Sequence, residues 1–375
     1  MQSRVLILGA GFGGLELATI LSAELGADAG VTLIDEAEAF VFGYSKLDVM
    51  FGRTSPESVR LAYAEIDKPG VTFRRETVTA IDPESRRVTT NAGVHEAEHL
   101  VVALGAGYDI DATPGVVLGE NEFYSVPGAE RLAPAVAAFD EGHAVIGVCG
   151  APFKCPPAPS EACLLLDDHL RERGCRDRCT ITFVIPLPSP VPPSPETSEA
   201  LTAAFAERDI RFVPERRLAS VDADAKTVAL DDGAELPCDL LLAVPRHRAP
   251  EVVRASGMAE DGYIPVDSRT LRTRFANVYA CGDVATVGVP KAGVFAEGAA
   301  RSVATSLLAA LRGESGDGHY DGLGSCYIEF GQGRVGRVDV DFLSGPKPTG
   351  TFQAPSDALV AEKEHFGSSR RARWF

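Results

Sequence analysis

Positive charge is scarce in this sequence, and so are long apolar runs. Its 36 Lys and Arg against 53 Asp and Glu give a formal net charge of −17, which argues against nucleic acid as a partner and disfavours adsorption to an anionic membrane surface. No run of 18 apolar residues occurs, so we expect no membrane-spanning segment. The apolar strand pattern begins at residue 5 and leaves no room for an export signal, so we expect a cytoplasmic protein.

The spacing of a redox or zinc cysteine pair is missing where two cysteines come close together. Of the eight cysteines, Cys175 and Cys179 do not have C-x-x-C spacing, and we expect a structural role for both. Without an export signal, cysteines are reduced structural thiols or catalytic groups. Cys155 stands apart, because residues 152–161 read PFKCPPAPSE, and these proline and small-residue neighbours are typical of an exposed turn.

A glycine-rich loop follows the first predicted strand. Residues 5–8 are an apolar strand, residues 9–14 read GAGFGG, and a helical pattern covers 15–25 before a second strand ends in Asp35. This context indicates a dinucleotide-binding loop. Gly9 permits the tight turn, Gly11 lets the backbone approach a pyrophosphate, and Gly14 lets helix and strand pack closely. Asp35 has the position of a carboxylate that binds ribose hydroxyls.

The rest of the chain alternates strands and helices. Short strands with turns over 71–111 predict β-hairpins that end in a buried strand at 99–106. Six prolines in residues 186–195 predict a stiff surface loop, beside a ligand cleft or serving as a docking motif. The other predicted elements are strands at 144–148, 180–185 and 277–281, helices at 160–173, 196–208 and 294–311, short strands over 211–242, and strands over 327–342.

The glycine loop and the motif YACGD at 279–283 together resemble the two-part FAD signature of the pyridine nucleotide-disulfide oxidoreductase superfamily. The resemblance implies that Asp283 contacts the ribityl chain of FAD and that the helix after Gly293 points its N-terminus toward the flavin ring. The cofactor-binding residues that it implies are Gly9, Gly11, Gly13, Gly14, Asp35, Ala103, Gly105, Gly282, Asp283, Lys291, Ala292 and Gly293.

Within that superfamily, residues 152–161 together with GSCY at 324–327 resemble flavocytochrome c sulfide dehydrogenase and the sulfide:quinone oxidoreductases. The resemblance implies that Cys155 and Cys326 form a redox disulfide over one face of the flavin. HS⁻ would attack a disulfide sulfur, leaving a persulfide and expelling the other cysteine as a thiolate. Glu161 would move the proton, and Lys291 and Lys154 would stabilise negative charge, unless Lys154 is a solvated surface residue.

Three departures from that family refine the expectation. Residues 122–126 (EFYSV) lack the third cysteine of many quinone reductases, and residues 40–44 (FVFGY) lack the cysteine that holds the flavin covalently in flavocytochromes, so we expect non-covalent FAD. There is no haem-attachment motif, which leaves a quinone or another acceptor. The basic, aromatic tail at 366–375 would either touch a membrane interface at the inner face or cover a domain or subunit surface, as in a homodimer.

The predicted fold class is α/β, with two Rossmann-like three-layer domains of the FAD/NAD(P)-binding, disulfide-reductase-like type and a C-terminal α+β block. At 375 residues, the length suits two to three domains. We expect residues 1–111 and 262–313 to form a discontinuous FAD-binding domain and residues 112–261 a degenerate NAD(P)-binding-like domain. Residues 314–375 would form a third block at the flavin cleft or an interface.

Three functions fit these patterns. The first is an FAD-dependent oxidoreductase that oxidises sulfide, or a related small sulfur compound, and passes electrons to a quinone or another acceptor. The second is an NAD(P)H-dependent flavin oxidoreductase, such as a type II NADH dehydrogenase or a disulfide reductase. It is disfavoured because residues 147–152 (GVCGAP) place proline where backbone N–H groups should face phosphate. The third is a non-enzymatic flavin-binding scaffold, which would not require the two matched cysteines.

Overall fold

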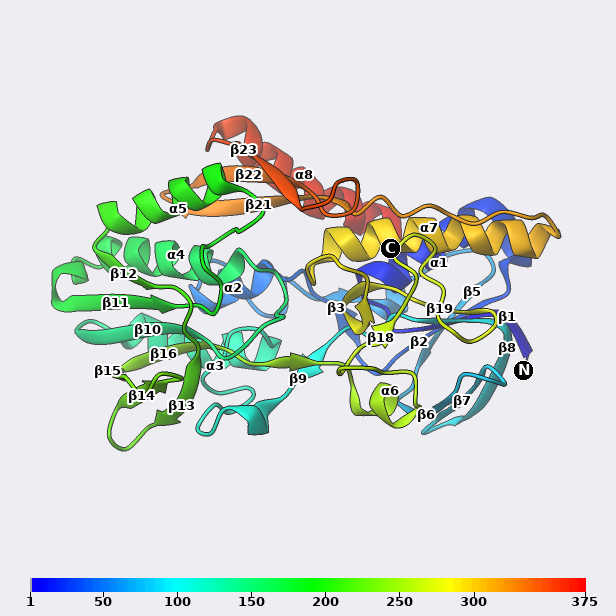
Figure 1. Ribbon diagram of the computed structural model, residues 1–375, viewed down its shortest axis with the longest axis horizontal. Coiled ribbons are helices and arrows are strands. Elements are labelled where there is room, and N and C mark those ends of the chain that lie inside the picture. The colour runs from blue at the N-terminus through cyan, green and yellow to red at the C-terminus, as the bar shows by residue number, and fades with distance from the viewer. Residues whose placement is uncertain (1) are drawn as a thin grey trace.

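The computed structural model describes residues 2–375, with side chains from Arg4 onward. Its first unit is built on a mostly parallel sheet with the order β5-β2-β1-β8-β7-β6, in which β19 also pairs with β8 (Figure 1). The strands are β1 (Gln2–Leu8), β2 (Val31–Asp35), β5 (Val71–Arg75), β6 (Val78–Asp82), β7 (Arg87–Thr90), β8 (Gly93–Val102) and β19 (Val278–Ala280). Helices α1 (Phe12–Leu25) and α7 (Gly293–Arg312) pack against each other beside this sheet. Segments nearly 300 residues apart in sequence therefore share one core.

The second unit has a four-stranded parallel sheet with the order β12-β11-β10-β16. Successive residues of β10 point to opposite faces, as in any strand. Ala144 and Ile146 join the core formed with helices α3 and α4, and Val145 joins a smaller core under the β13-β14-β15 sheet. The elements are α3 (Val126–Ala138), β10 (Gly142–Val148), α4 (Ala158–Glu172), β11 (Cys179–Val184), α5 (Pro195–Glu207), β12 (Ile210–Val213), β13 (Leu218–Asp222), β14 (Thr227–Leu230), β15 (Glu235–Pro237) and β16 (Leu240–Val244). The two sheets confirm the predicted α/β fold.

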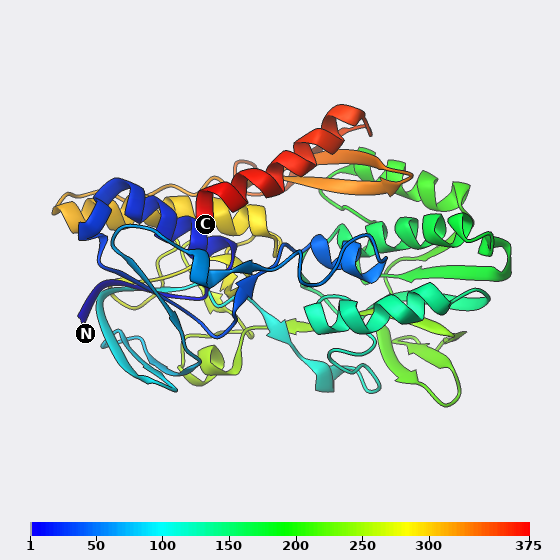
Figure 2. The same cartoon turned by 180° about the vertical axis from the view of Figure 1, so that it is seen from behind.

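A third block joins the two units. Its antiparallel strands are β21 (Leu323–Gly331), β22 (Arg334–Asp341) and β23 (Thr349–Gln353), and β21 packs on both α4 and α7. Helix α8 (Asp357–Trp374) then runs back to the first unit and contacts α1 (Figure 2). Its N-terminus is capped by Ser356, whose hydroxyl accepts a hydrogen bond from the N–H of Leu359. The sequence did not predict this helix.

The tail covers part of the first unit. Trp374 is fully buried, and its Nε1 donates a hydrogen bond to Oε2 of Glu16 on α1 at 3.0 Å. Of the two alternatives for the tail, the structure therefore shows it covering a domain surface. Helix α7 is the one helix of residues 2–375 that is long and apolar enough to cross a membrane, and 56% of the relevant window is buried inside the protein.

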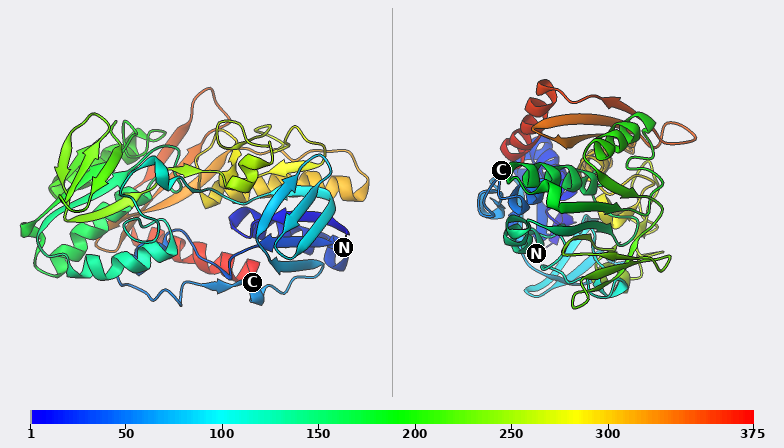
Figure 3. Two further views of the ribbon diagram at one scale, coloured as in Figure 1. Left: turned by 90° about the horizontal axis from the view of Figure 1, so that it is seen from below. Right: turned by 90° about the vertical axis from the view of Figure 1, so that its left-hand side faces the viewer.

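The chain crosses between the units at several points, which Figure 3 shows lying side by side along the long axis. Helix α2 (Ser45–Met50) packs its apolar residues into the second core. Ala249, Val253 and Met258 lie in the first core, ahead of the return predicted at residue 262. The domain limits themselves stay a prediction. The remaining short elements are β3 (Ala39–Phe40), β4 (Leu61–Ala62), β9 (Gly107–Tyr108), β17 (His247–Arg248), α6 (Glu251–Ala255), β18 (Ile264–Pro265) and β20 (Ala285–Thr286).

Candidate active site

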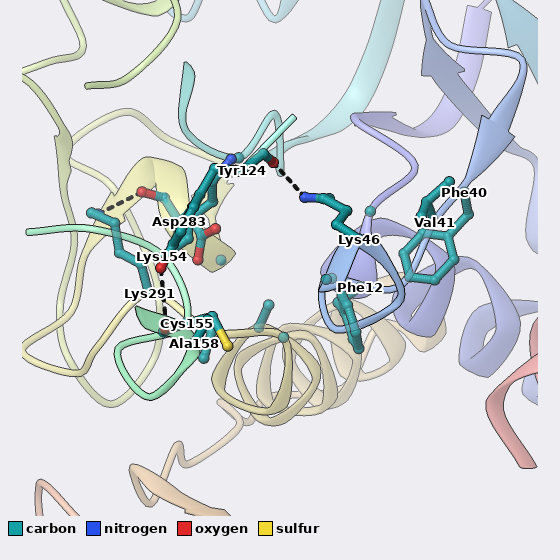
Figure 4. A pocket seen from close by; sticks show the side chains of 18 of the residues that line it. Phe12, Phe40, Val41, Lys46, Tyr124, Lys154, Cys155, Ala158, Asp283 and Lys291 are labelled. Atoms are coloured by element: carbon teal, nitrogen blue, oxygen red, sulfur yellow. Dashed lines mark hydrogen bonds between the residues drawn. The ribbon is translucent and has the colours of Figure 1, made fainter. Parts of the chain in front are cut away.

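A cavity lies where the two units meet, between the glycine loop, the start of α7 and the loop that precedes α4 (Figure 4). We call it the flavin cavity. It collects most of the residues that the sequence predicted for the cofactor. Those that line it are Gly11, Gly13, Ala103, Gly105, Gly282, Asp283, Lys291, Ala292 and Gly293, together with Cys155.

The glycines of the loop are needed for two different reasons. A side chain at Gly9 would collide with the carbonyl of Ala103, and one at Gly14 would collide with the carbonyl of Gly9. Both glycines therefore allow β1, β8 and α1 to pack closely. Gly11 instead faces open space, with nothing within 4 Å of where its Cβ would stand. A diphosphate can approach the backbone there, next to the N-terminus of α1, so the loop fits a dinucleotide such as FAD.

Asp35 ends β2 beside the glycine loop and is not part of the cavity wall. Its Oδ2 accepts a hydrogen bond from the N–H of Ala10 at 2.7 Å, and its Oδ1 accepts one from Ala37 at 2.9 Å. These contacts hold the loop in place. A direct contact of Asp35 with ribose stays a prediction.

The opposite end of the flavin cavity is formed by the start of α7. This helix begins at Gly293 with no acidic residue in its first turn, so its free N–H groups and positive dipole end are available to negative charge. Lys291 precedes it and donates a hydrogen bond from Nζ to the carbonyl of Asp283 at 2.6 Å. Burial lowers the pKa of Lys291 to about 8, and burial raises the pKa of Asp283.

Two further lysines line the flavin cavity. Lys154 donates hydrogen bonds from Nζ to the carbonyl of Ala106 at 3.1 Å and to the hydroxyl of Tyr108 at 3.0 Å, so it is not a solvated surface residue. Lys46 on α2 donates to the carbonyl of Tyr124 at 2.6 Å. Burial lowers the pKa of both. The sequence did not indicate Lys46, because only the crossing of α2 between the units brings it here.

Cys155 occupies the turn that leads into α4. Its φ of +48° is unusual for a residue with a side chain. Its backbone N–H donates to the carbonyl of Lys291 at 2.7 Å, and its carbonyl accepts the N–H of Ala158 at 2.9 Å. Burial, and then the nearby Glu161 and Cys326, raise the pKa of the Cys155 thiol well above its usual range. The loop between the first strand and helix of the second unit thus delivers a cysteine to the cavity, where a nucleotide-binding unit would hold phosphate.

Cys326 and Glu161 reach the same place from different elements. Cys326 lies on β21, and Glu161 lies in the first turn of α4 and accepts the backbone N–H of Glu329 on β21 at 2.9 Å. Burial raises the pKa of Glu161 to about 7 and, together with Glu161, that of Cys326 to about 12. Cys155 and Cys326 are free thiols in this structure. Both feel the charge of Glu161, so the two predicted cysteines and the predicted carboxyl form one group.

The other cysteines near these elements serve packing. Cys281 is fully buried, with its Sγ beneath Gly13 of the glycine loop. Cys175 and Cys179 are buried in the second core, as the sequence predicted.

Comparisons with known proteins agree with this geometry. Residues 3–303 match the pyridine nucleotide-disulphide oxidoreductase family. The mitochondrial sulfide:quinone oxidoreductase of Mus musculus is 26% identical over 375 residues, which covers 95% of this chain and 82% of the mouse protein. The sulfide-quinone reductase of Aquifex aeolicus is 26% identical over 349 residues, covering 83% of this chain and 77% of that protein. The type II NADH:quinone oxidoreductase of Staphylococcus epidermidis is 37% identical over 106 residues, only 28% of this chain and 26% of that protein.

Among solved structures, the sulfide:quinone oxidoreductase of Aquifex aeolicus superposes with a TM-score of 0.84 at 21% identity, covering 99% of this chain and 92% of that one. This likeness confirms the fold. The chain belongs to the pyridine nucleotide-disulphide oxidoreductase family. It is an FAD-dependent oxidoreductase, and the resemblance read from its motifs is confirmed at this level.

Proposed function

We propose that this family member oxidises sulfide, or a related small sulfur compound, at Cys155 and Cys326 and passes the electrons through FAD to a quinone. The observation that carries the proposal is that two cysteines from separate parts of the fold meet beside a buried carboxyl with a pKa of about 7, at the edge of the flavin cavity. The names of the mouse and Aquifex relatives support sulfide as donor and quinone as acceptor.

The reaction starts from a disulfide between Cys155 and Cys326. Cys326 lines a second, outer cavity, whereas Cys155 lines the flavin cavity. HS⁻ that enters from outside therefore attacks the sulfur of Cys326; a new S–S bond forms, the bond to Cys155 breaks, and Cys155 leaves as a thiolate with the electron pair. Glu161 as a carboxylate takes the proton of the incoming sulfide.

FAD, when bound, supplies the acceptor for these two electrons and passes them on. The residues of this chain favour that direction by charge. Lys46, Lys154 and Lys291 lie around the flavin cavity and stabilise the negative charge that develops there. Because the pKa of each cysteine is raised, the reduced thiols stay protonated and are poor nucleophiles on their own. An external sulfur nucleophile is thus the reactant that starts the cycle.

The NAD(P)H-dependent alternative fits the second unit less well. Its first strand–helix loop carries Pro152, Lys154 and Cys155, and the last two side chains line the flavin cavity. Helix α4 starts with proline at its first positions, which removes N–H groups that would face a phosphate. We propose a cytoplasmic protein that meets its quinone at the inner face of a membrane; the homodimer stays a prediction.

Anaerobic titration of the yellow holoenzyme with sulfide and, separately, with NADH tests the proposal. Sulfide should bleach the flavin and NADH should not. Cys155→Ser should abolish bleaching by sulfide while FAD stays bound, with Cys281→Ser as a control at a buried cysteine outside the pair. Rapid bleaching by NADH alone, or reduction of the Cys155→Ser protein at the wild-type rate, would falsify the assignment.

A further inference from the structure

The outer cavity lies on the far side of the Cys155 loop from the flavin cavity and has a volume of about 510 Å³. Three segments form its walls: the loop that carries Cys155, the proline-rich loop before α5, and strands β21 and β22. Cys326 is part of the wall. Ala151, Pro152 and Pro192 at the rim are exposed, so the cavity reaches the surface. A small molecule that enters here meets the sulfur of Cys326.

The wall offers almost nothing to a charged ligand. Among the described residues that line it, Lys291 is the one charged group, and its Nζ is already bound to the carbonyl of Asp283. Seven lining residues are prolines, which have no backbone N–H to donate. An anion needs cations or N–H groups to replace its water, so it would be unpaired in this cavity. The proline-rich loop thus makes an apolar wall that excludes anions.

The proposed function leaves one sulfur atom to be removed. After HS⁻ has attacked, Cys326 carries a persulfide, and the disulfide with Cys155 cannot form again until the outer sulfur has been transferred. A thiol, RSH, can take it: its sulfur bonds to the outer sulfur, the bond to Cys326 breaks, and Cys326 regains a proton. The net change is HS⁻ + RSH → RSSH + H⁺ + two electrons, and the electrons leave by the route proposed above.

We propose that the outer cavity binds a small uncharged alkyl thiol and that this thiol accepts the sulfur from Cys326. The proposal rests on the proposed function, and it names the class of co-substrate. The cavity wall favours it over anionic sulfur acceptors such as sulfite or glutathione, which would find no partner for their charge. The cavity also fits an apolar quinone by polarity, but Cys326 in its wall favours a ligand that reacts with sulfur.

The first experiment measures access to Cys326 without turnover. The reduced holoenzyme is treated with propyl methanethiosulfonate or with the anionic sulfonatoethyl methanethiosulfonate, and labelling is quantified by peptide mass spectrometry. Cys238 serves as an internal reference, because it is also partly exposed and burial also raises its pKa to about 12. The neutral-to-anionic labelling ratio should be at least tenfold higher at Cys326 than at Cys238. Equal ratios at the two cysteines, or protection of Cys326 by saturating short-chain quinone, would overturn the proposal.

A matched pair of variants tests the wall itself. Leu187 lines the cavity and is half-buried. Leu187→Arg should raise labelling of Cys326 by the anionic reagent at least fivefold relative to Leu187→Met, because it supplies a cation. No difference between the two variants would contradict an exclusion by charge.

Turnover with sulfide and quinone then compares 1-propanethiol, sulfite and glutathione, with alkylated persulfide products measured by mass spectrometry. Propyl persulfide should be the main product, whereas sulfite and glutathione should not accelerate turnover above the rate without an acceptor. Sulfite or glutathione as the better acceptor would overturn the proposal. Bleaching by sulfide alone is recorded in parallel: if it fails while Cys326 keeps its neutral selectivity, the proposed function is wrong and not the cavity's selectivity.

Discussion

At the scale of single residues, burial sets the chemistry of the site. Glu161 lies in the interior, and this burial raises its pKa to about 7. Burial lowers the pKa of Lys291 to about 8. A group whose pKa lies near the working pH exchanges its proton at little cost in either direction, which suits an acid–base catalyst. The positions of these groups in the sequence indicated their roles, but their pKa values come from the surrounding elements.

The role of Glu161 predicts a pH dependence. Its carboxylate accepts the proton of sulfide, so the rate of flavin reduction should rise with pH with a midpoint near 7. Dissolved sulfide itself deprotonates in this range, and Glu161→Gln is therefore the reference: it should keep the part due to sulfide, lose the part due to the carboxylate, and fall about 100-fold at pH 8. Stopped-flow absorbance of the flavin measures both profiles. Superimposable wild-type and variant profiles would exclude the role.

The same shift predicts an effect on stability. The pKa of Glu161 is raised in the folded protein, so its contribution is fully present below the unfolded value of 4.5 and is lost as pH rises through about 7. Glu161→Gln should therefore have a higher melting temperature relative to wild type at pH 8 than at pH 5. Thermal denaturation of the holoenzyme at both pH values measures it. A difference of opposite sign would show that the buried carboxylate is stabilised by its neighbours.

Lys46 gives a test of the charge around the flavin cavity. Lys46→Met removes a buried cation while keeping much of the side chain's length, and it should lower the two-electron potential of bound FAD by on the order of 30 mV, equivalent to about 1.4 kcal/mol. Equilibration with redox dyes gives the potential. Lys68→Met, at a lysine outside the cavity, is the control. An unchanged potential in Lys46→Met would remove Lys46 from the electrostatic account.

At the scale of elements, α8 holds the glycine loop from behind. The ring of Phe12 in that loop lies 5.4 Å from the ring of Trp374 and 5.2 Å from that of Phe40, edge to face. Glu16 on α1 is buried and binds Arg301, Arg373 and Trp374. Helix α8 therefore reaches the cofactor loop through aromatic packing and a shared carboxylate. Its charged sequence conceals this, because its buried residues are few and widely spaced.

Removing this anchor should affect both stability and cofactor binding. Trp374→Ala leaves a cavity beside Phe12 and an unpaired Glu16, and should cost about 3–5 kcal/mol of unfolding free energy and weaken FAD binding. Urea denaturation and FAD titration of the apoprotein measure the two effects. Arg371→Ala, at an exposed position of the same helix, should change neither. Wild-type stability of Trp374→Ala would mean that α8 is only loosely attached.

At the scale of the whole molecule, the site exists because three parts of the chain meet. The first unit supplies the glycine loop and Lys291, the second supplies Cys155 and Glu161, and the third block supplies Cys326. An ion cluster ties them together beside Glu161: Glu329 on β21 binds Arg53, which follows α2, and Lys363 of α8. A change in the third block should thus be felt at the carboxyl of the second unit.

Glu329→Gln tests this coupling. The charge of Glu329 raises the pKa of Glu161, while Arg53 and Lys363 lower it. Removing the negative charge leaves both cations facing Glu161, so the midpoint of the pH profile should move down by about one unit. Stopped-flow reduction by sulfide gives the midpoint, and Glu362→Gln, at a more exposed partner of Arg337 on α8, should leave it unchanged. A midpoint that moves up or stays would refute the coupling.

The local patterns of the sequence by themselves determined the glycine loop, the Gly282-Asp283 motif before α7 and the turn of Cys155, because each depends on neighbours within a few residues. They also indicated Cys326, Glu161 and the α/β fold. Only the tertiary structure decided that Lys46 joins the flavin cavity, that α8 anchors the glycine loop and that the prolines wall an apolar cavity at Cys326. These features depend on contacts between segments far apart in the chain, and such contacts are set by how the whole core packs, which no local pattern records.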